Sequence, residues 1–270
     1  MTQQTYRERR PAAAVSPLVA TVWVQSVAPG GDAHAHRTIP HGAVELSCAI
    51  GGMPRVVGPQ TVPRVETLAP GATVVGVRFR LGAAPSVLGL PASALVDATV
   101  DAFELWRDRA AELGERIAGA ESPEDASATL EAAVLDRVAD PPDPVVAEVA
   151  QRLLPGRTDN VADLPSALFI SERQLRRRVQ SGIGLAPKVV QRMLRFQGFL
   201  ALAHGRGGEP AELAMLAAEA GYADQSHLTH ESLRLAGLSP AALMCESAEN
   251  CRAAGHDHAV SYTPLLHGLA

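Results

Sequence analysis

The segment that decides the fold reads SERQLRRRVQSGIGLAP and runs from Ser171 to Pro187. Ser171 and Gln174 have the spacing of a capping box, in which the side chain of each residue bonds the backbone N–H of the other. A helix is therefore expected to begin at Ser171. Leu175 and Val179, four residues apart, would face the core, so the arginines of this helix would lie on the opposite, solvent-facing side.

A shorter amphipathic pattern precedes this helix. Val161, Leu164 and Leu168 recur at helical spacing just before Ser171. Two helices joined by a tight turn, of which the second is polar and rich in arginine, are typical of a helix-turn-helix that places its second helix in the DNA major groove. Arginine suits that role because its planar guanidinium group can bond guanine O6 and N7 at once.

Basic charge is concentrated in the same region. Residues 171–206 carry a net charge of +7, whereas the whole chain of 270 residues carries −5. A basic element on a near-neutral domain indicates a polyanion as partner. The alternative is a solvated helix face, and charge alone does not decide between the two.

The helix-turn-helix pattern then recurs. The apolar stripe of residues 211–220 predicts a further helix that Gly221 can end, and Asp224 can cap the next helix, which would run to Leu235. Between the two pairs, residues 187–204 are long enough for one rod of about 27 Å. Two reading heads held by such a rod can address successive turns of one DNA face, about 34 Å apart.

Three segments at these positions carry a family resemblance: SERQLRRRVQSGIGLAP (171–187), AAEAGYADQSHLTHE (217–231) and AGLSP (236–240). Over about 100 residues, from Val145 to Met244, the chain resembles the two-headed DNA-binding domain of AraC/XylS-type bacterial transcription regulators. The resemblance implies base contacts by Arg173, Arg176 and Arg177 in the first head. In the second head it implies base contacts by Gln225, Ser226 and His230.

The other residues expected at the DNA interface are Gln174, Lys188 and Arg192. Lys188 and Arg192 are expected to meet phosphates or acidic side chains. The second head departs from the family pattern, because His230 stands where arginine is usual and Ser232 where a bulky aromatic is usual. We therefore expect a looser second head, with most of the affinity in the first.

The N-terminal part has a different pattern. Residues 18–80 contain short β-branched runs separated by Gly and Pro turns, whereas residues 94–116 and 122–138 have helical periodicity. We predict an α+β chain: a small β-barrel or sandwich with flanking helices, followed by an all-α double helix-turn-helix. The expected parts are a flexible leader (1–17), a sensor or oligomerisation domain (18–142), the DNA-binding domain (143–245) and a tail (246–270).

The segments IPHGAVELSC (39–48), VVGPQT (56–61) and GVRFRLGAAPSVLG (76–89) are similar to a cupin-like N-terminal domain found on some AraC-type regulators. That resemblance names no effector. The candidate effector-binding residues are Trp23, Arg78 and Arg80. Arg78 and Arg80 should face one side of their strand and could hold an anion or form paired surface charges; Trp23 could equally be a core residue.

A metal site is the competing prediction for this domain. His34, His36 and His41, with Glu45 nearby, suggest the histidine and glutamate set of a cupin-type metal-binding protein or metalloenzyme. However, nine residues separate His36 from Glu45, which is longer than the cupin spacing. The leading interpretation therefore includes no metal and no cofactor.

The function expected from these patterns is sequence-specific DNA binding by a transcription regulator that responds to a small molecule. The partners are double-stranded promoter DNA and an unknown effector, with RNA polymerase and a second copy of the chain as further candidates. No set of nucleophile, base and orienting group is evident, so we expect no enzyme activity. The apolar runs are too short for a membrane span and no secretion signal is evident, so we expect the protein in the cytoplasm.

Overall fold

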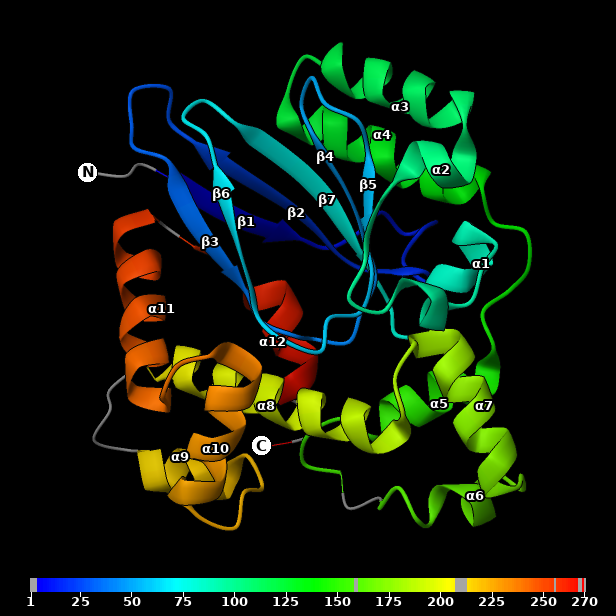
Figure 1. Ribbon diagram of the computed structural model, residues 1–270, viewed down its shortest axis with the longest axis vertical. Helices are drawn as coiled ribbons and strands as arrows, with labels where there is room; N and C mark the ends of the chain where they lie inside the picture. The colour runs from blue at the N-terminus through cyan, green and yellow to red at the C-terminus, as the bar shows by residue number, and fades with distance from the viewer. Residues whose placement is uncertain (1–3, 158–159, 207–212, 255, 267–268, 270) are drawn as a thin grey trace.

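A six-stranded antiparallel sheet organises the N-terminal half. The computed structural model describes residues 4–157, 160–206, 213–254, 256–266 and 269. The sheet order is β1-β2-β7-β4-β5-β8, and its strands are β1 (Gln4–Arg9), β2 (Val19–Val27), β4 (Glu45–Ala49), β5 (Arg55–Val57), β7 (Thr73–Phe79) and β8 (Thr99–Asp101). A separate two-stranded ribbon pairs β3 (His34–Thr38) with β6 (Arg64–Leu68) (Figure 1).

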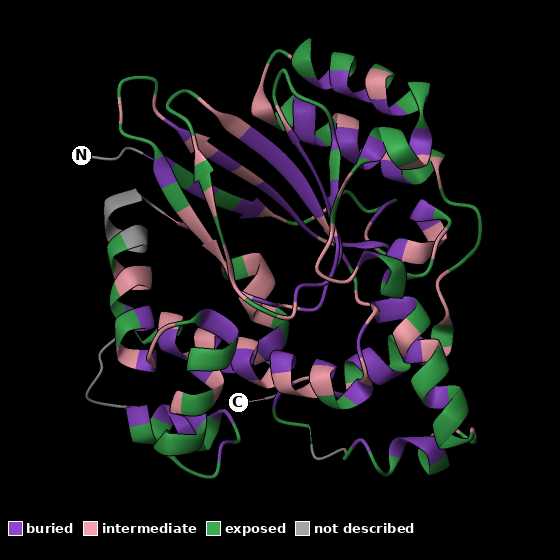
Figure 2. Ribbon diagram, viewed as in Figure 1, coloured by how far each residue is buried: buried purple, intermediate pink, exposed green. Residues whose placement is uncertain are grey.

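The two faces of the sheet differ in polarity. On β7, Val75, Val77 and Phe79 point into an apolar core. This face is covered by α3 (Asp108–Ala118) and α4 (Pro123–Asp136) (Figures 1 and 2). Because side chains alternate along a strand, the other face carries Arg78 of β7 together with Glu8 of β1 and Glu45 of β4, its partners in ion pairs. One face therefore builds the core, and the other can build a site.

Three short helices precede α3 in the chain: α1 (Ala84–Leu88), the 3₁₀ helix η1 (Ala92–Leu95) and α2 (Ala102–Trp106). The helix expected over 94–116 is wrong in part, since β8 interrupts it and Arg107, with a φ of 52°, separates α2 from α3. The start of α4 agrees with expectation. Ser122 accepts a hydrogen bond from the Asp125 backbone at 3.1 Å, and Pro123 occupies the first turn.

Eight helices are described in the C-terminal half: α5 (Pro144–Arg152), α6 (Leu164–Ala167), α7 (Glu172–Ile183), α8 (Pro187–Gly205), α9 (Leu213–Glu219), α10 (Gln225–Ala236), α11 (Pro240–Ala254) and α12 (Ala259–Leu266). The predicted long rod is α8, whose Phe196 and Phe199 are fully buried in a second core. Residues 211–212 of the helix predicted over 211–220 lie outside the described residues. None of the described helices has both the length and the apolar character needed to span a bilayer. The α+β class with a C-terminal helical part is confirmed.

The leader is a correction to the sequence prediction. Residues 4–9, expected to be flexible, form the edge strand β1, which pairs with β2 from Gln4 opposite Val27 to Arg9 opposite Val22. Tyr6 is buried and stacks on Trp23 with 6.1 Å between ring centroids. The sequence of this strand resembles a polar leader because the side chains that it buries, Gln4, Tyr6 and Glu8, are themselves polar.

The tail is a second correction. The expected boundary at residue 245 falls inside α11, and α12 packs against α8 and against strands β1 and β2. The Asp257 backbone N–H donates to the Tyr6 carbonyl at 3.0 Å. The C-terminal segment therefore joins the helical half to the polar face of the sheet.

Candidate functional site

The second helix of the predicted first head begins as the sequence predicts. Ser171 Oγ accepts from the Gln174 backbone N–H at 3.2 Å, and Gln174 Oε1 accepts from the Ser171 N–H at 2.9 Å. This capping box starts α7, and Leu175 and Val179 are buried beneath it. The carbonyl oxygen of the Gln174 side chain thus serves the cap, which is a structural role beside the DNA contact expected of this residue.

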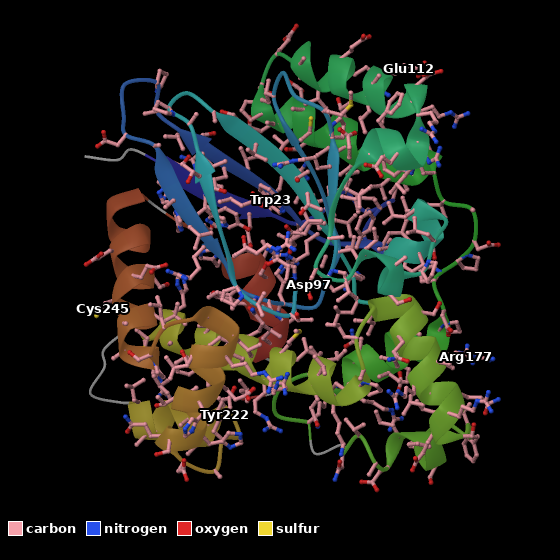
Figure 3. The ribbon with its side chains drawn as sticks, in the orientation of Figure 1. Trp23, Asp97, Glu112, Arg177, Tyr222 and Cys245 are labelled. Carbon is pink, nitrogen blue, oxygen red and sulfur yellow. The ribbon has the colours of Figure 1, made fainter. Side chains whose placement is uncertain are left out.

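Four arginines of α7 divide into two groups. Arg178 turns back and holds Asp143, the cap of α5, with two short contacts of 2.6 and 2.7 Å. Arg173, Arg176 and Arg177 are exposed, and Figure 3 shows Arg177 pointing away from the body of the protein. One arginine therefore fixes the helix while three present positive charge to solvent.

The helices at the predicted second head are α9 and α10. Asp224 Oδ1 accepts from the His227 N–H at 2.7 Å and caps α10, as the sequence predicts. Gln225, Ser226 and His230 are exposed on this helix. The two helices α7 and α10 lie toward opposite ends of α8 (Figure 1).

The two residues expected to contact phosphates, Lys188 and Arg192, differ in their surroundings. Lys188, near the start of α8, is exposed. Arg192 instead forms an ion pair with Glu231 of α10 at 3.1 Å, and so links the rod to the second head. Of these two residues, only Lys188 has a side chain that presents its charge to solvent.

Ser232 makes a hydrogen bond to a backbone carbonyl, at a position where an aromatic residue is usual in the family that the sequence resembles. Its side chain is fully buried, and Oγ donates to the Leu238 carbonyl at 2.7 Å. This bond ties α10 to the turn that precedes α11. The serine therefore has a specific structural role at the position where the sequence suggested only a loss of packing.

We expect Ser232→Ala to lower the free energy of unfolding by about 1–3 kcal/mol, because the Leu238 carbonyl would be left buried without its partner. Urea unfolding of the full chain measures this. Ser226→Ala, an exposed change on the same helix, serves as the control and should stay within about 0.5 kcal/mol of the parent. Equal midpoints for the two variants would contradict the assigned role of Ser232.

A cavity of about 600 Å³ lies between the polar face of the sheet, the ribbon β3–β6, and helices α5, α8 and α12. This volume is within the range of pockets that bind small molecules. Trp23, Arg78 and Arg80, the three predicted effector residues, all line it. Their positions around one cavity agree with the sequence prediction. The contacts that Arg78 and Arg80 make with the rest of the protein, however, differ.

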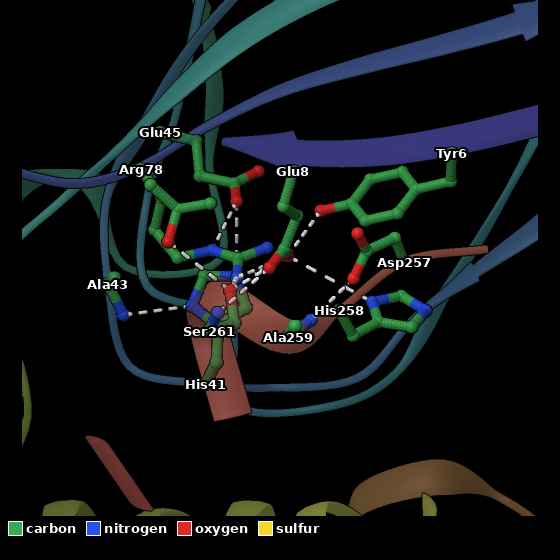
Figure 4. Close-up of polar contacts among 11 residues, drawn as sticks. Tyr6, Glu8, His41, Ala43, Glu45, Arg78, Asp257, His258, Ala259 and Ser261 are labelled. Atoms are coloured by element: carbon green, nitrogen blue, oxygen red, sulfur yellow. Dashed lines mark hydrogen bonds and ion pairs between the residues drawn. The ribbon is translucent and has the colours of Figure 1, made fainter. Parts of the chain in front are cut away.

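Arg78 is held between two carboxylates (Figure 4). Its Nε donates to Glu45 Oε1 at 2.7 Å, and its Nη1 lies 3.7 Å from Glu8 Oε1. The same Nη1 donates to Ser261 Oγ at 2.7 Å, and that hydroxyl donates onward to Glu8 Oε1 at 2.7 Å. Arg80, by contrast, is exposed and donates to the Ser16 carbonyl at 2.6 Å. The pair of free arginines that could clamp an anion is therefore not assembled.

Glu8 is the most enclosed member of this network. Its side chain has no exposed surface. It accepts hydrogen bonds from Tyr6 Oη at 2.9 Å and from the Ser261 backbone N–H at 2.8 Å. Sequence reasoning missed both Glu8 and Ser261 because they lay in the expected leader and tail. The alternation of Gln4, Tyr6 and Glu8 was the available signal, since all three point to one face.

Both carboxylates are ionised. Burial alone would raise the pKa of Glu45, but the charge of Arg78 and the bond to His41 outweigh it and lower the pKa to about 2. Burial opposes ionisation of Glu8 too, yet the nearby His258, the charge of Arg78 and the hydrogen bonds from Ser261 lower its pKa. Burial lowers the pKa of His41, and lowers that of His36 to about 4, so both are neutral at pH 7.

Acid should therefore destabilise the protein through Glu45. A carboxyl whose pKa is depressed from its ordinary 4.5 to about 2 on folding adds stability above pH 4.5, and that stability is lost as pH falls toward 2. The urea midpoint, measured from pH 6 down to pH 3, should decrease. Glu45→Gln should show a shallower decrease over the same range, and parallel curves would contradict this assignment.

The predicted metal set is not brought together. His41 Nδ1 accepts from the Ala43 N–H at 3.1 Å and Nε2 lies 3.5 Å from Glu45, while His36 stacks on Tyr6. Within the part of the chain that the structure describes, no group of three or more His, Cys, Asp or Glu side chains is placed to hold a metal ion. His34 lies beside His36, with 6.4 Å between their ring centroids, whereas His41 pairs with Glu45.

Comparison with known proteins gives limited matches. Residues 7–101 match a family model described as a domain of unknown function, DUF6597. No curated protein matches the chain. Solved structures of ToxT from Vibrio cholerae are similar to it: an apo variant from strain SCE256 (11% identity, 83% of this chain and 96% of that chain, TM-score 0.44), ToxT from O395 (9%, 91% and 96%, 0.44), and unsaturated fatty acid-bound wild-type ToxT from SCE256 (10%, 90% and 94%, 0.41). At these values the matches assign neither a ligand nor a function to the chain.

Proposed function

We propose that this protein is a sequence-specific DNA-binding transcription regulator whose interdomain cavity takes a small-molecule effector. The observation that carries the proposal is the exposed arginine face of α7, on a helix that is correctly capped and tied to α5. The second capped helix, α10, supports it, since it exposes Gln225, Ser226 and His230 from the other end of α8. Arginine, glutamine and serine are among the side-chain types that read base edges in the major groove.

The position of the cavity suggests how an effector would act. Its lining comes from the sheet, from the ribbon β3–β6 and from helices of the DNA-reading half, so a ligand would touch both halves. Arg37 lines the cavity, donates to the Ala236 carbonyl at the end of α10 at 3.3 Å, and pairs with Glu246 of α11 at 3.0 Å. An effector that favours one arrangement of these contacts would change DNA affinity by about 1–3 kcal/mol.

Three further parts of the proposal follow from the sequence alone. The protein would act in the cytoplasm, it would have no catalytic activity of its own, and it would meet RNA polymerase at the promoter. A second copy of the chain is a further candidate partner. DNA binding is the part that the geometry supports directly.

Selection of bound DNA from a random pool tests the proposal. The full chain, at a fixed salt concentration, should enrich a bipartite motif whose halves lie about 10 base pairs apart, one helical turn. Gln225→Ala with Ser226→Ala should remove the preference in one half and leave the other. A pool without any enriched motif would exclude sequence-specific reading.

A further inference from the structure

Two carboxylates and one guanidinium group lie together at the floor of the cavity. Glu8 and Glu45 are both ionised, whereas Arg78 alone lies between them and contacts both. His36 and His41, whose rings lie near Glu45 and Arg78, are neutral at pH 7. His258 approaches Glu8 with Nδ1 at 3.9 Å, and Tyr6 donates its hydroxyl to Glu8. An unbalanced negative charge in such a buried place favours a positively charged occupant.

The other arginines of the lining do not offset this charge. Arg37 directs its guanidinium group to Glu246 and the end of α10. Arg80 donates to the Ser16 carbonyl, and Arg55 is exposed to solvent. An anionic group that entered the cavity would therefore meet two carboxylates at its floor and a guanidinium group already shared between them.

Polar atoms without partners mark where a ligand can bond. Gln25 and Gln60 line the cavity and are only 4% and 6% exposed. Gln25 Nε2, Gln60 Oε1 and Trp23 Nε1 have no hydrogen-bond partner among the described residues. Buried polar groups normally have partners, so these atoms indicate bonds that a ligand would complete.

The opposite wall is apolar. Leu194 and Leu200 of α8 and Leu265 of α12 line the cavity across from the polar face of the sheet. The indole ring of Trp23 adds an aromatic surface, of the kind on which a cationic group also binds well. The cavity thus offers an acidic floor and an apolar wall to the same molecule.

We infer that the cavity binds a small amphiphile with a protonated amine head, placed at Glu45, and an apolar body against α8 and α12. This deepens the proposed function, since it names the chemical class of the effector. Of the two roles that the sequence left open for Arg78 and Arg80, it disfavours the binding of an anion.

Calorimetric titration of the full chain at pH 7 tests the inference with three probes that share one body: phenylbutylamine, phenylbutanol and phenylbutanoate. The amine should bind at least about tenfold more tightly than the carboxylate, with the alcohol between them. A tighter carboxylate, equal affinities, or no binding of any probe at millimolar concentration would each overturn the inference.

Two variants locate the binding. Glu45→Gln should weaken the amine about tenfold and strengthen the carboxylate, because only one carboxylate then remains beside the guanidinium group. Glu148→Gln changes an exposed carboxylate at the cavity's edge and should leave the order of the probes unchanged. The titrations contain no DNA, so their outcome is independent of the motif selection. If the amine binds best but no DNA motif is enriched, the proposed regulatory function is wrong and the proposed class of ligand stands.

Discussion

Replacing Arg78 by leucine is expected to lower the free energy of unfolding at pH 7 by about 3–5 kcal/mol, the usual cost of removing one partner from a buried ion pair. The substitution would leave the carboxylates of Glu8 and Glu45 enclosed, without the guanidinium group that now lies 2.7 Å from Glu45. It would also remove a bond to Ser261. Urea unfolding of the full chain, with circular dichroism as the signal, measures the loss.

The charge, and not the lost volume, should cause this effect. Adding Glu8→Gln and Glu45→Gln to Arg78→Leu should therefore restore part of the lost stability. Acid should narrow the difference between the Arg78→Leu variant and the parent, because the stranded carboxylates then bind protons and become neutral. If the single and triple variants unfold at the same urea concentration at every pH, the ion network does not stabilise the sheet.

Loss of Arg173 and Arg177 should abolish most specific DNA binding. Each arginine that bonds a guanine in the major groove contributes about 1–3 kcal/mol of discrimination, so the double alanine variant should bind its selected site far more weakly and with a relaxed motif. Both side chains are exposed on α7, and removing them should leave the helix intact. Fluorescence anisotropy at one fixed salt concentration gives the affinity.

Two neighbouring cations provide matched controls. Lys188→Ala should weaken binding to all sequences alike and flatten its salt dependence, as expected of a phosphate contact. Arg178→Ala, which breaks the pair with Asp143, should lower stability and leave the preferred bases unchanged. An unaltered motif in the Arg173→Ala/Arg177→Ala variant would show that α7 does not read DNA.

The helical half was the easier part to predict because its signals are local. The capping pair Ser171 and Gln174 lies within one turn of α7, and Asp224 caps α10 within three residues. Short-range hydrogen bonds of this kind can be read from spacing alone. The sequence is therefore sufficient to place the two heads and the rod between them.

The cavity could not be predicted in the same way. Its central ion network joins strands β1, β4 and β7 with α12, so no single stretch of sequence contains it. A strand that buries a polar face, such as β1, also lacks the apolar alternation that identifies most strands. Ser232 shows the same limit, because the carbonyl that it bonds is set by the turn beyond the helix.

The contact between Glu8 and Ser261 has a consequence for protein synthesis. The two residues are 253 positions apart. At about 5–20 residues per second, a ribosome needs about 13–50 s to travel between them. During that interval β1 and β2 can pair while Glu8 still faces water. The complete ion network therefore belongs only to chains that have been translated past Ser261.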